Sequence, residues 1–267
     1  MNKVNYVFYQ KDIDLLLYWI YILKITFFGE KMLLLGIDLE TTMADASNEG
    51  TRILEIGAVL YDWDLKQHVD IFNPLIKPYG QNFHIDSFVT RLTGINMKML
   101  RDHGINIKVA LRKLIRMAEK ADFLVAHNGR LFDKKVLIKE CEKFDLEFPE
   151  KFMIDTLVDI DYPPTCKYKN LTYLAGFHSI LPGGHRALSD VMTMIEVLKR
   201  YDFQKTIKNT GKVKIKVITK NPEKDRRTAI SMGFKWDRHR RYWHRKYSRD
   251  EWKEVKDKLT FEVIVEE

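Results

Sequence analysis

The chain has 267 residues, of which 45% are hydrophobic, so it can bury a full core as one large domain or as one domain with a small appendage. Its two cysteines, Cys141 and Cys166, lie in no CxxC pattern, which excludes a disulfide framework and a four-ligand zinc site and indicates a reducing, cytoplasmic environment. The net charge of +8 favours an acidic partner.

Residues 1–31 form an N-terminal extension to which the sequence assigns no clear role. The apolar stretch 13–28 is interrupted by Asp14 and Lys24 and is shorter than the roughly 20 residues that a spanning helix needs. No signal-peptide cleavage pattern follows it. We expect a docking segment, or sequence upstream of a natural start at Met32, and no stable membrane association.

The next part of the chain alternates strand and helix patterns. Strands are predicted over residues 33–40, 52–62, 68–78 and 123–127. Helices are predicted over residues 105–121, 132–144 and 190–201. Strands that are followed by strand–helix units predict an α/β domain with a mixed sheet flanked by helices.

Two carboxylates interrupt the apolar pattern at the end of the first predicted strand. Asp38 and Glu40 are two positions apart and therefore share one face of that strand. Most acidic pairs with this spacing lie on solvated edges, but here two like charges end a buried strand, which favours a cation between them. Asp133 and Asp190 each lie at the predicted start of a helix, where either one alone is explained as a helix-start acid.

The four carboxylates together favour a metal site over helix capping. A strand end and two helix starts can meet at one edge of a sheet, and four oxygen ligands suit Mg²⁺ or Mn²⁺ better than zinc. His185 lies five residues before Asp190, in the loop "GGHRALSD". A loop histidine is more often structural or exposed, so a catalytic interpretation depends on its pairing with Asp190.

Three short motifs connect these residues with a known family. "DLETT", "HNGRLFD" and "HRALSD" resemble, in order, the three exonuclease motifs of the DnaQ-like DEDDh superfamily of 3′-to-5′ exonucleases, and "RILEIGAV" resembles its second strand. The resemblance covers about residues 32–203 and implies an RNase H-like fold. Met43 departs from the glycine that many members have there. The spacing from Asn128 to Asp133 resembles stand-alone exonucleases more than polymerase proofreading subunits.

The resemblance also implies roles for individual residues. It assigns two divalent metal ions, Mg²⁺ or Mn²⁺, to Asp38, Glu40, Asp133 and Asp190. It gives His185 the role of general base, because imidazole can take a proton from the attacking water near neutral pH. Weaker candidates for holding the terminal nucleotide are Thr41, Thr42, Asn128 and Phe132.

The end of the chain carries almost all of the net charge. Residues 211–267 contain 17 Lys and Arg against 10 Asp and Glu, a net charge of +7. The turn signal Asn209–Gly211 precedes a new strand pattern, so we predict a main domain over residues 32–208 and a small basic α+β domain over residues 212–267.

Basic and aromatic residues alternate in the segment "FKWDRHRRYWHRKY" of this second domain, a composition that suits nucleic-acid binding. The candidate residues for phosphate contact are Arg238, Arg240, Arg241, Arg245 and Lys246. A domain this small also needs large side chains inside, so Trp236 and Trp243 are predicted in its core.

The expected function is a metal-dependent 3′-to-5′ exonuclease that acts on single-stranded DNA or DNA 3′ ends and releases nucleoside monophosphates. An RNA 3′-end-trimming enzyme is the alternative within the same chemistry, and a DNA polymerase is a candidate partner. A non-catalytic nucleic-acid-binding or adaptor protein is the rival class, because a fold alone does not define function.

Overall fold

A computed structural model describes residues 31–182, 184–210, 214–238, 240–248, 252 and 254–266. The chain divides into two compact units, residues 1–210 and 211–267. The apolar stretch at residues 13–28 lies outside the described residues. Within the part of the chain that is described, no helix is both long and apolar enough to cross a membrane.

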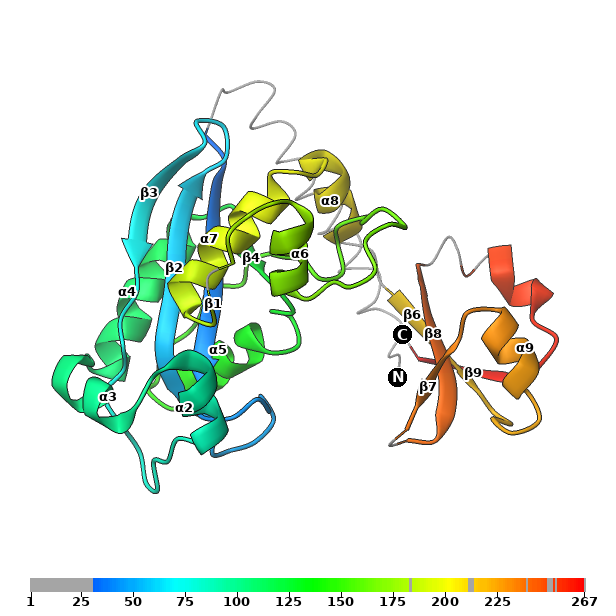
Figure 1. The fold of residues 1–267 in the computed structure, drawn as a ribbon, viewed down its shortest axis with the longest axis horizontal. Coiled ribbons are helices and arrows are strands. Elements are labelled where there is room, and N and C mark those ends of the chain that lie inside the picture. Colours follow the sequence, from blue (N-terminus) through cyan, green and yellow to red (C-terminus); the bar gives the residue numbers. More distant parts are fainter. Residues whose placement is uncertain are drawn as a thin grey trace, which may run out of the picture. The chain divides into compact units, whose positions relative to one another are not determined.

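The first unit is built on a five-stranded mixed sheet with the order β3-β2-β1-β4-β5 (Figure 1). Strands β1 and β2 are antiparallel, as are β2 and β3, whereas β4 runs parallel to both β1 and β5. The strands are β1 (Leu33–Thr41), β2 (Ile53–Asp62), β3 (Gln67–Phe72), β4 (Phe123–Ala126) and β5 (Met153–Asp155). The predicted mixed sheet is confirmed.

Helices cover both faces of this sheet. Leu35, Ile37 and Leu39 of β1 point into a core shared with α4 (Ile107–Lys120) and α5 (Asp133–Glu142). Leu34 of β1 and Val59 of β2 point the opposite way, into a core shared with α7 (Ala187–Leu198). Figure 1 shows α7 lying across one face of β1 and β2. The alternation of side chains along β1 therefore decides which helix each residue meets.

Two predicted elements differ from the structure. The third strand was expected to reach Pro78 but ends at Phe72, because Pro74 and Pro78 have no N–H to donate to a sheet. Leu75 and Ile76 keep only isolated bridges, to Glu55 and Ile105. The last predicted helix begins three residues earlier, at Ala187, so Asp190 lies inside its first turn rather than at its first position.

Four further helices lie in the described part of the first unit, beyond the three that were predicted. They are α2 (Ser87–Thr93), α3 (Met97–His103), α6 (Leu171–Phe177) and α8 (Phe203–Thr210). The first three have seven residues each and begin after Asp86, Asn96 and Asn170, whose side chains accept a backbone N–H of the first turn. Local capping therefore defines these helices, because seven residues are too few for a clear apolar stripe.

The second unit is a small α+β domain, as predicted. Its four strands form an antiparallel sheet with the order β7-β8-β6-β9. The elements are β6 (Lys214–Thr219), α9 (Arg226–Ser231), β7 (Lys235–Asp237), β8 (Tyr242–Ser248), a 3₁₀ turn (Lys256–Lys258) and β9 (Val263–Glu266). Its core is formed by Val217, Ala229, Phe234 and Tyr247.

The two tryptophans of the second unit differ in their environments. Trp243 packs against the core, and its Nε1–H donates to the Pro222 carbonyl oxygen at 3.0 Å. Trp236 is 39% exposed and contacts Trp243 with ring centroids 5.1 Å apart. The prediction of a core position is confirmed for Trp243 and wrong for Trp236. Trp236 lies on β7, a three-residue strand at the edge of the sheet, where only one side is covered.

Candidate active site

The first two candidate ligands lie together near the end of β1. Asp38 and Glu40 are half-buried on one face of the strand, opposite Gly57 and Glu55 of β2. The pairing register shifts directly after Glu40, which forms a β-bulge. Bulges interrupt regular strand pairing and redirect side chains. Here the bulge marks the end of regular pairing directly after Glu40.

Asp190 reaches the same place from α7. Carboxylate oxygens of Asp38, Glu40 and Asp190 all lie within 4.8 Å of one another. Asp190 is in the first turn of a helix that crosses the face of β1 and β2 from which Asp38 and Glu40 project. The structure thus brings together three acidic groups from positions up to 152 residues apart in the sequence.

Asp133 approaches β1 from the other core. It is 3% exposed, and the Leu39 amide between Asp38 and Glu40 hydrogen-bonds its carboxylate. Its Oδ1 has no hydrogen-bond partner among the described residues. Asp133 does not belong to the group of three, but its charge raises the pKa of Asp38. An unpartnered buried carboxylate oxygen beside an acidic group fits a cation ligand.

Burial and mutual repulsion raise the pKa values of all four carboxyl groups. Desolvation is the main cause in each case. The pKa of Asp38 is raised well above its ordinary value by burial and then by the charges of Asp133 and Glu40. Burial, with the charges of Asp190 and Glu55, raises the pKa of Glu40 to about 8, and burial raises that of Asp133 to about 7. Such a cluster of hard oxygen donors is ionised together only when a cation balances it, which fits Mg²⁺ or Mn²⁺.

His185 lies beside this cluster in an exposed position. Its proximity to Asp190 is evident in the pKa of that carboxyl group, which burial raises and the His185 charge lowers. His185 and the preceding Gly184 both have left-handed backbone conformations, with φ of 55° and 71°. For a non-glycine residue this conformation is uncommon, and it turns the chain from the loop into α7.

The predicted nucleotide-holding residues lie in the two loops next to the carboxylates. The hydroxyls of Thr41 and Thr42 donate to the backbone oxygens of Met43 and Gly50, at 2.6 and 3.4 Å, so they stabilise their own loop. Asn128 has a left-handed φ of 66°, and its N–H donates to Asp155 Oδ1 at 2.8 Å. Phe132 is half-buried against the core directly before α5.

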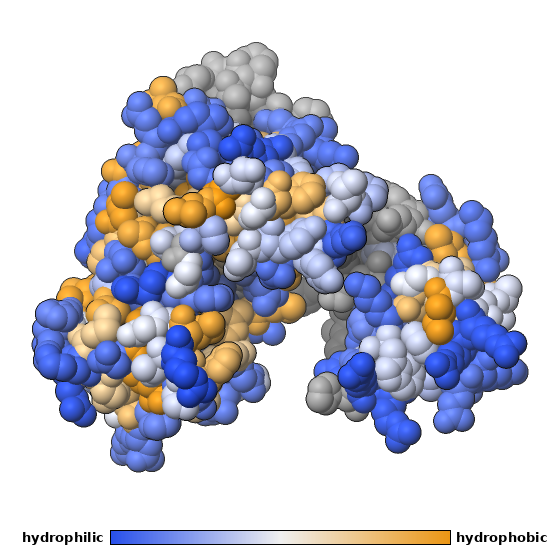
Figure 2. All heavy atoms as spheres, viewed as in Figure 1, coloured by the Kyte–Doolittle hydropathy of each residue, from blue (hydrophilic) through white to orange (hydrophobic). Residues whose placement is uncertain are grey.

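The candidate basic residues of the second unit do not form one uniform group. Arg238, Arg240 and Arg241 are exposed around the turn between β7 and β8. Arg245 is exposed as well but donates to the Met232 carbonyl oxygen and lies over the Tyr247 ring, and Arg240 Nη1–H donates to the Tyr242 hydroxyl oxygen at 3.2 Å, so both make contacts within their own domain. The side chain of Lys246 lies outside the described residues. In the view of Figure 2, the surface of this unit is mainly hydrophilic.

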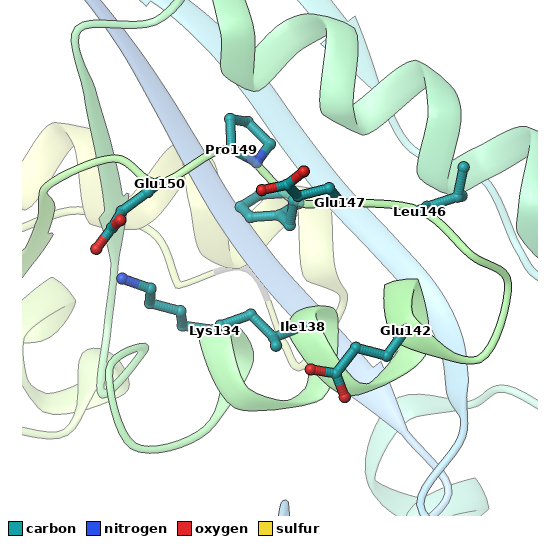
Figure 3. A pocket seen from close by; sticks show the side chains of 8 residues that line it. Lys134, Ile138, Glu142, Leu146, Glu147, Pro149 and Glu150 are labelled. Carbon is teal, nitrogen blue, oxygen red and sulfur yellow. The ribbon is translucent and has the colours of Figure 1, made fainter.

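A pocket on the first unit lies apart from these residues. It has a volume of about 310 Å³ and lies between α5 and the segment 146–150 (Figure 3). Lys134 and Ile138 of α5 line it together with Phe148 and Glu150. None of the predicted site residues lines this pocket, so it is separate from the candidate active site.

Sequence reasoning missed a buried ion pair beside the carboxylates. Glu55, which is completely buried on β2, binds Arg186 directly before α7. A signal for it was present, since Glu55 is a single acidic residue inside the apolar run "ILEIGAVL". A lone charge in such a run is expected to have a specific partner.

Comparison with known proteins places the first unit in a family. The RNase T family of exonucleases matches residues 35–198. The chain is 32% identical over 185 residues to the PolC-type DNA polymerase III of Caldanaerobacter subterraneus subsp. tengcongensis, covering 68% of this chain and 12% of the polymerase. It is 30% identical over 179 residues to the exonuclease DPD1 of Arabidopsis thaliana, covering 61% of this chain and 54% of that protein. The chain thus spans only part of the length of both relatives.

Solved structures show the same fold. Exonuclease I of E. coli in complex with a dA16 oligonucleotide matches 71% of this chain and 48% of its own, with a TM-score of 0.57 and 14% sequence identity. The nuclease domain of 3′hExo, a DEDDh family member bound to rAMP, matches 64% of this chain and 92% of its own, with a TM-score of 0.52 and 19% identity. The RNase H-like fold and the DEDDh resemblance are confirmed.

Proposed function

Because the chain belongs to the RNase T family of exonucleases, we propose that it is a metal-dependent 3′-to-5′ exonuclease that hydrolyses phosphodiester bonds at DNA 3′ ends and releases nucleoside monophosphates. One observation carries the proposal most directly. Oxygens of Asp38, Glu40 and Asp190 lie within 4.8 Å of one another on the fold that this family uses. A non-catalytic adaptor would have no need to maintain such a repulsive cluster.

The residues that would hold two divalent ions, Mg²⁺ or Mn²⁺, are Asp38, Glu40, Asp133 and Asp190. When bound, the ions supply charge stabilisation at the attacked phosphate and the leaving oxygen and activate water. After burial, the charge of Asp133 is the largest cause that raises the pKa of Asp38, so Asp133 lies close enough to the group of three to be proposed as a ligand with it.

His185 is the proposed general base, because it is exposed, lies next to Asp190 and can take a proton from the attacking water. Thr41, Thr42, Asn128 and Phe132 are proposed to hold the terminal nucleotide through the two loops that they shape. Since both threonine hydroxyls bind their own loop, their contribution would come through the loop backbone.

The second unit is proposed to hold nucleic acid through phosphates. Arg238, Arg240 and Arg241 are exposed at one turn of a unit with a net charge of +7. Arg245 is less suited, because it stabilises its own domain. A DNA polymerase is a further proposed partner, in view of the PolC-type relative. The buried free thiols of Cys141 and Cys166 support a reducing compartment such as the cytoplasm.

The proposal is tested with purified protein on 5′-labelled DNA and RNA oligonucleotides of matched sequence, with Mg²⁺, Mn²⁺ or EDTA. We expect stepwise shortening of DNA from its 3′ end, with mononucleotide release and no activity in EDTA. Faster shortening of the RNA would favour the exoribonuclease alternative. Tight oligonucleotide binding without shortening, under every metal condition, would favour the adaptor and refute the enzyme.

A further inference from the structure

The buried ion pair beside the acidic cluster involves a residue in direct register with a candidate ligand. Glu55 of β2 lies opposite Glu40 of β1 in the antiparallel pair, so both side chains are on the face that α7 covers. Glu55 is completely buried. A buried carboxylate next to three other acidic groups is strongly unfavourable unless donors surround it.

Three residues from two different segments donate hydrogen bonds to the Glu55 carboxylate. The Arg186 guanidinium binds both oxygens, with Nε at 3.0 Å from Oε2 and Nη2 at 2.5 Å from Oε1. The backbone N–H of Ala187, the first residue of α7, donates to Oε2 at 3.1 Å. The Asn73 amide donates to Oε1, also at 3.1 Å, and to the Ile56 carbonyl oxygen. The Glu55 carboxylate thus accepts a hydrogen bond from a first-turn N–H of α7, a group that has no acceptor within the helix itself.

Close packing holds the same end of α7 against the sheet. A Cβ at Gly57 would lie 2.3 Å from the Ala187 carbonyl carbon, so only glycine fits there. Gly57 is the register partner of Asp38. The first residue of α7 therefore lies directly over the strand pair that carries Asp38, and this brings Asp190, three residues later, to the acidic group.

We propose that Glu55 and Arg186 are positioning residues that fix the start of α7, so that His185 and Asp190 are held at the group formed with Asp38 and Glu40. The inference rests on the proposed function but adds a separate claim. His185 and Asp190 flank the clamped pair of residues, Arg186 and Ala187, on both sides. Arg186 has no side-chain capping bond to its own helix, so its guanidinium is committed to β2.

The alternative is that this ion pair only stabilises the fold. The chain offers a matched control for that case. Glu140 of α5 is also a buried glutamate, 1% exposed, and it is paired with Lys143 at 2.6 Å, but among the described residues no hydrogen bond or ion pair joins it to the start of α7. Glu55→Gln and Glu140→Gln both replace a buried, cation-paired carboxylate by an amide of the same size. A purely structural role predicts similar consequences for both.

The test measures kcat and KM on one oligonucleotide, Mn²⁺ affinity by titration calorimetry without substrate, and the unfolding temperature. For Glu55→Gln we expect kcat and Mn²⁺ affinity to fall about 10- to 100-fold, as is usual when a group that orients a ligand is lost. KM should change less than about twofold. Arg186→Lys keeps the charge without the two-pronged geometry and should give an intermediate loss.

Further results decide between a positioning role and a purely structural role for this ion pair. The double variant Glu55→Gln/Arg186→Gln should be no worse than the more damaging single variant, because both changes remove one contact. Wild-type kcat and Mn²⁺ affinity in Glu55→Gln, or equal losses in Glu140→Gln, would overturn the inference. If the wild-type protein degrades no substrate, the proposed exonuclease activity is refuted, but the Mn²⁺ titrations still test the positioning role. Equal Mn²⁺ affinities of wild type and Glu55→Gln would refute that role. A lower Mn²⁺ affinity of Glu55→Gln would support it.

Discussion

The two units of this protein arrange charge in opposite ways. The first gathers acidic side chains in a partly buried place, where burial, with the charges of Asp190 and Glu55, raises the pKa of Glu40 to about 8. The second carries its excess of basic side chains on the surface, where Arg238, Arg240 and Arg241 are exposed. A tight, half-buried cluster suits small cations at fixed positions, whereas separated surface charges suit a long flexible polyanion. Each arrangement fits one half of a nuclease: chemistry in the first unit and retention of substrate in the second.

The largest effect is expected from breaking the acidic cluster. Asp38→Asn or Asp190→Asn should reduce 3′-end degradation by more than about 10³-fold, since several kcal/mol of charge stabilisation is lost. Release of labelled nucleotide from a DNA oligonucleotide measures the rate. Binding of a long oligonucleotide should persist in both variants, because we propose that the second unit provides it. Substantial activity in either variant would place the chemistry elsewhere.

A smaller loss is expected when only the proposed base is removed. His185→Ala should lower kcat by about 10²- to 10⁴-fold, the usual range for loss of a general base. Mn²⁺ affinity should stay close to wild type, because the four carboxylates are intact. An unchanged kcat would leave His185 as a loop residue without a catalytic role.

The sequence could predict four of the five strands of the first sheet and the three long helices, because each depends on a local pattern, but it did not predict the three-residue strand β5. Asp38 and Glu40 stand out as charges at the end of an apolar run. Metal-site geometry could not be predicted in the same way. Asp190 reaches the group of three because Gly57 lets α7 approach β2 closely, and Asp133 approaches β1 from the opposite core without joining that group. Such contacts depend on tertiary packing, which spacing along a chain does not contain.

The same limit applies in the second unit. Arg238 and Arg245 look equivalent in a basic, aromatic segment, but only the first is free of its own domain's core. Arg245 is on a strand whose alternate residues, Trp243 and Tyr247, face the core. Register along β8 distinguishes these roles, and it depends on which turn closes the hairpin.

A moderate effect is expected from removing the second unit. Ending the chain after Thr210 keeps the hydrogen bonds of Asn209 and Thr210 to Asp159. We expect KM on long substrates to rise about 10-fold or more, with weaker salt dependence, because fewer counterions are released on binding. Cleavage of a dinucleotide should change little. A milder variant, Arg238→Gln/Arg240→Gln/Arg241→Gln, should lower the affinity for long oligonucleotides and weaken its salt dependence, as the truncation does, but by less.

Salt titrations separate this role from protein recruitment. If the unit recruits a protein partner instead, the shortened chain and the full chain will bind oligonucleotides with equal affinity and equal salt slope. That result would refute the contrast drawn between the two units, while leaving the proposed chemistry of the first intact.

The smallest expected effect is on the stability of the metal-free protein. In the folded state the pKa values of Glu40 and Asp133 are raised to about 8 and about 7, so both groups hold protons that the unfolded chain has released. Between about pH 4.5 and 8 the folded state therefore binds more protons than the unfolded state, and the free energy of unfolding falls as pH rises. In EDTA, the unfolding temperature should be lower at pH 8 than at pH 5.

Glu40→Gln tests this account directly, because it removes a charge without changing the size of the side chain. In EDTA at pH 8 it should raise the unfolding temperature by about 2 to 4 °C, corresponding to about 1 kcal/mol after allowing for solvent screening at a half-buried site. At pH 5, where the wild-type carboxyl is already protonated, the difference should disappear. Mn²⁺ should reverse the order at pH 8, since it stabilises the ionised wild-type cluster more than the variant. If the variant is less stable than wild type in EDTA at pH 8, the carboxylates are not held together against repulsion. The contrast between a mutually repelling acidic cluster and an exposed basic surface would then be refuted.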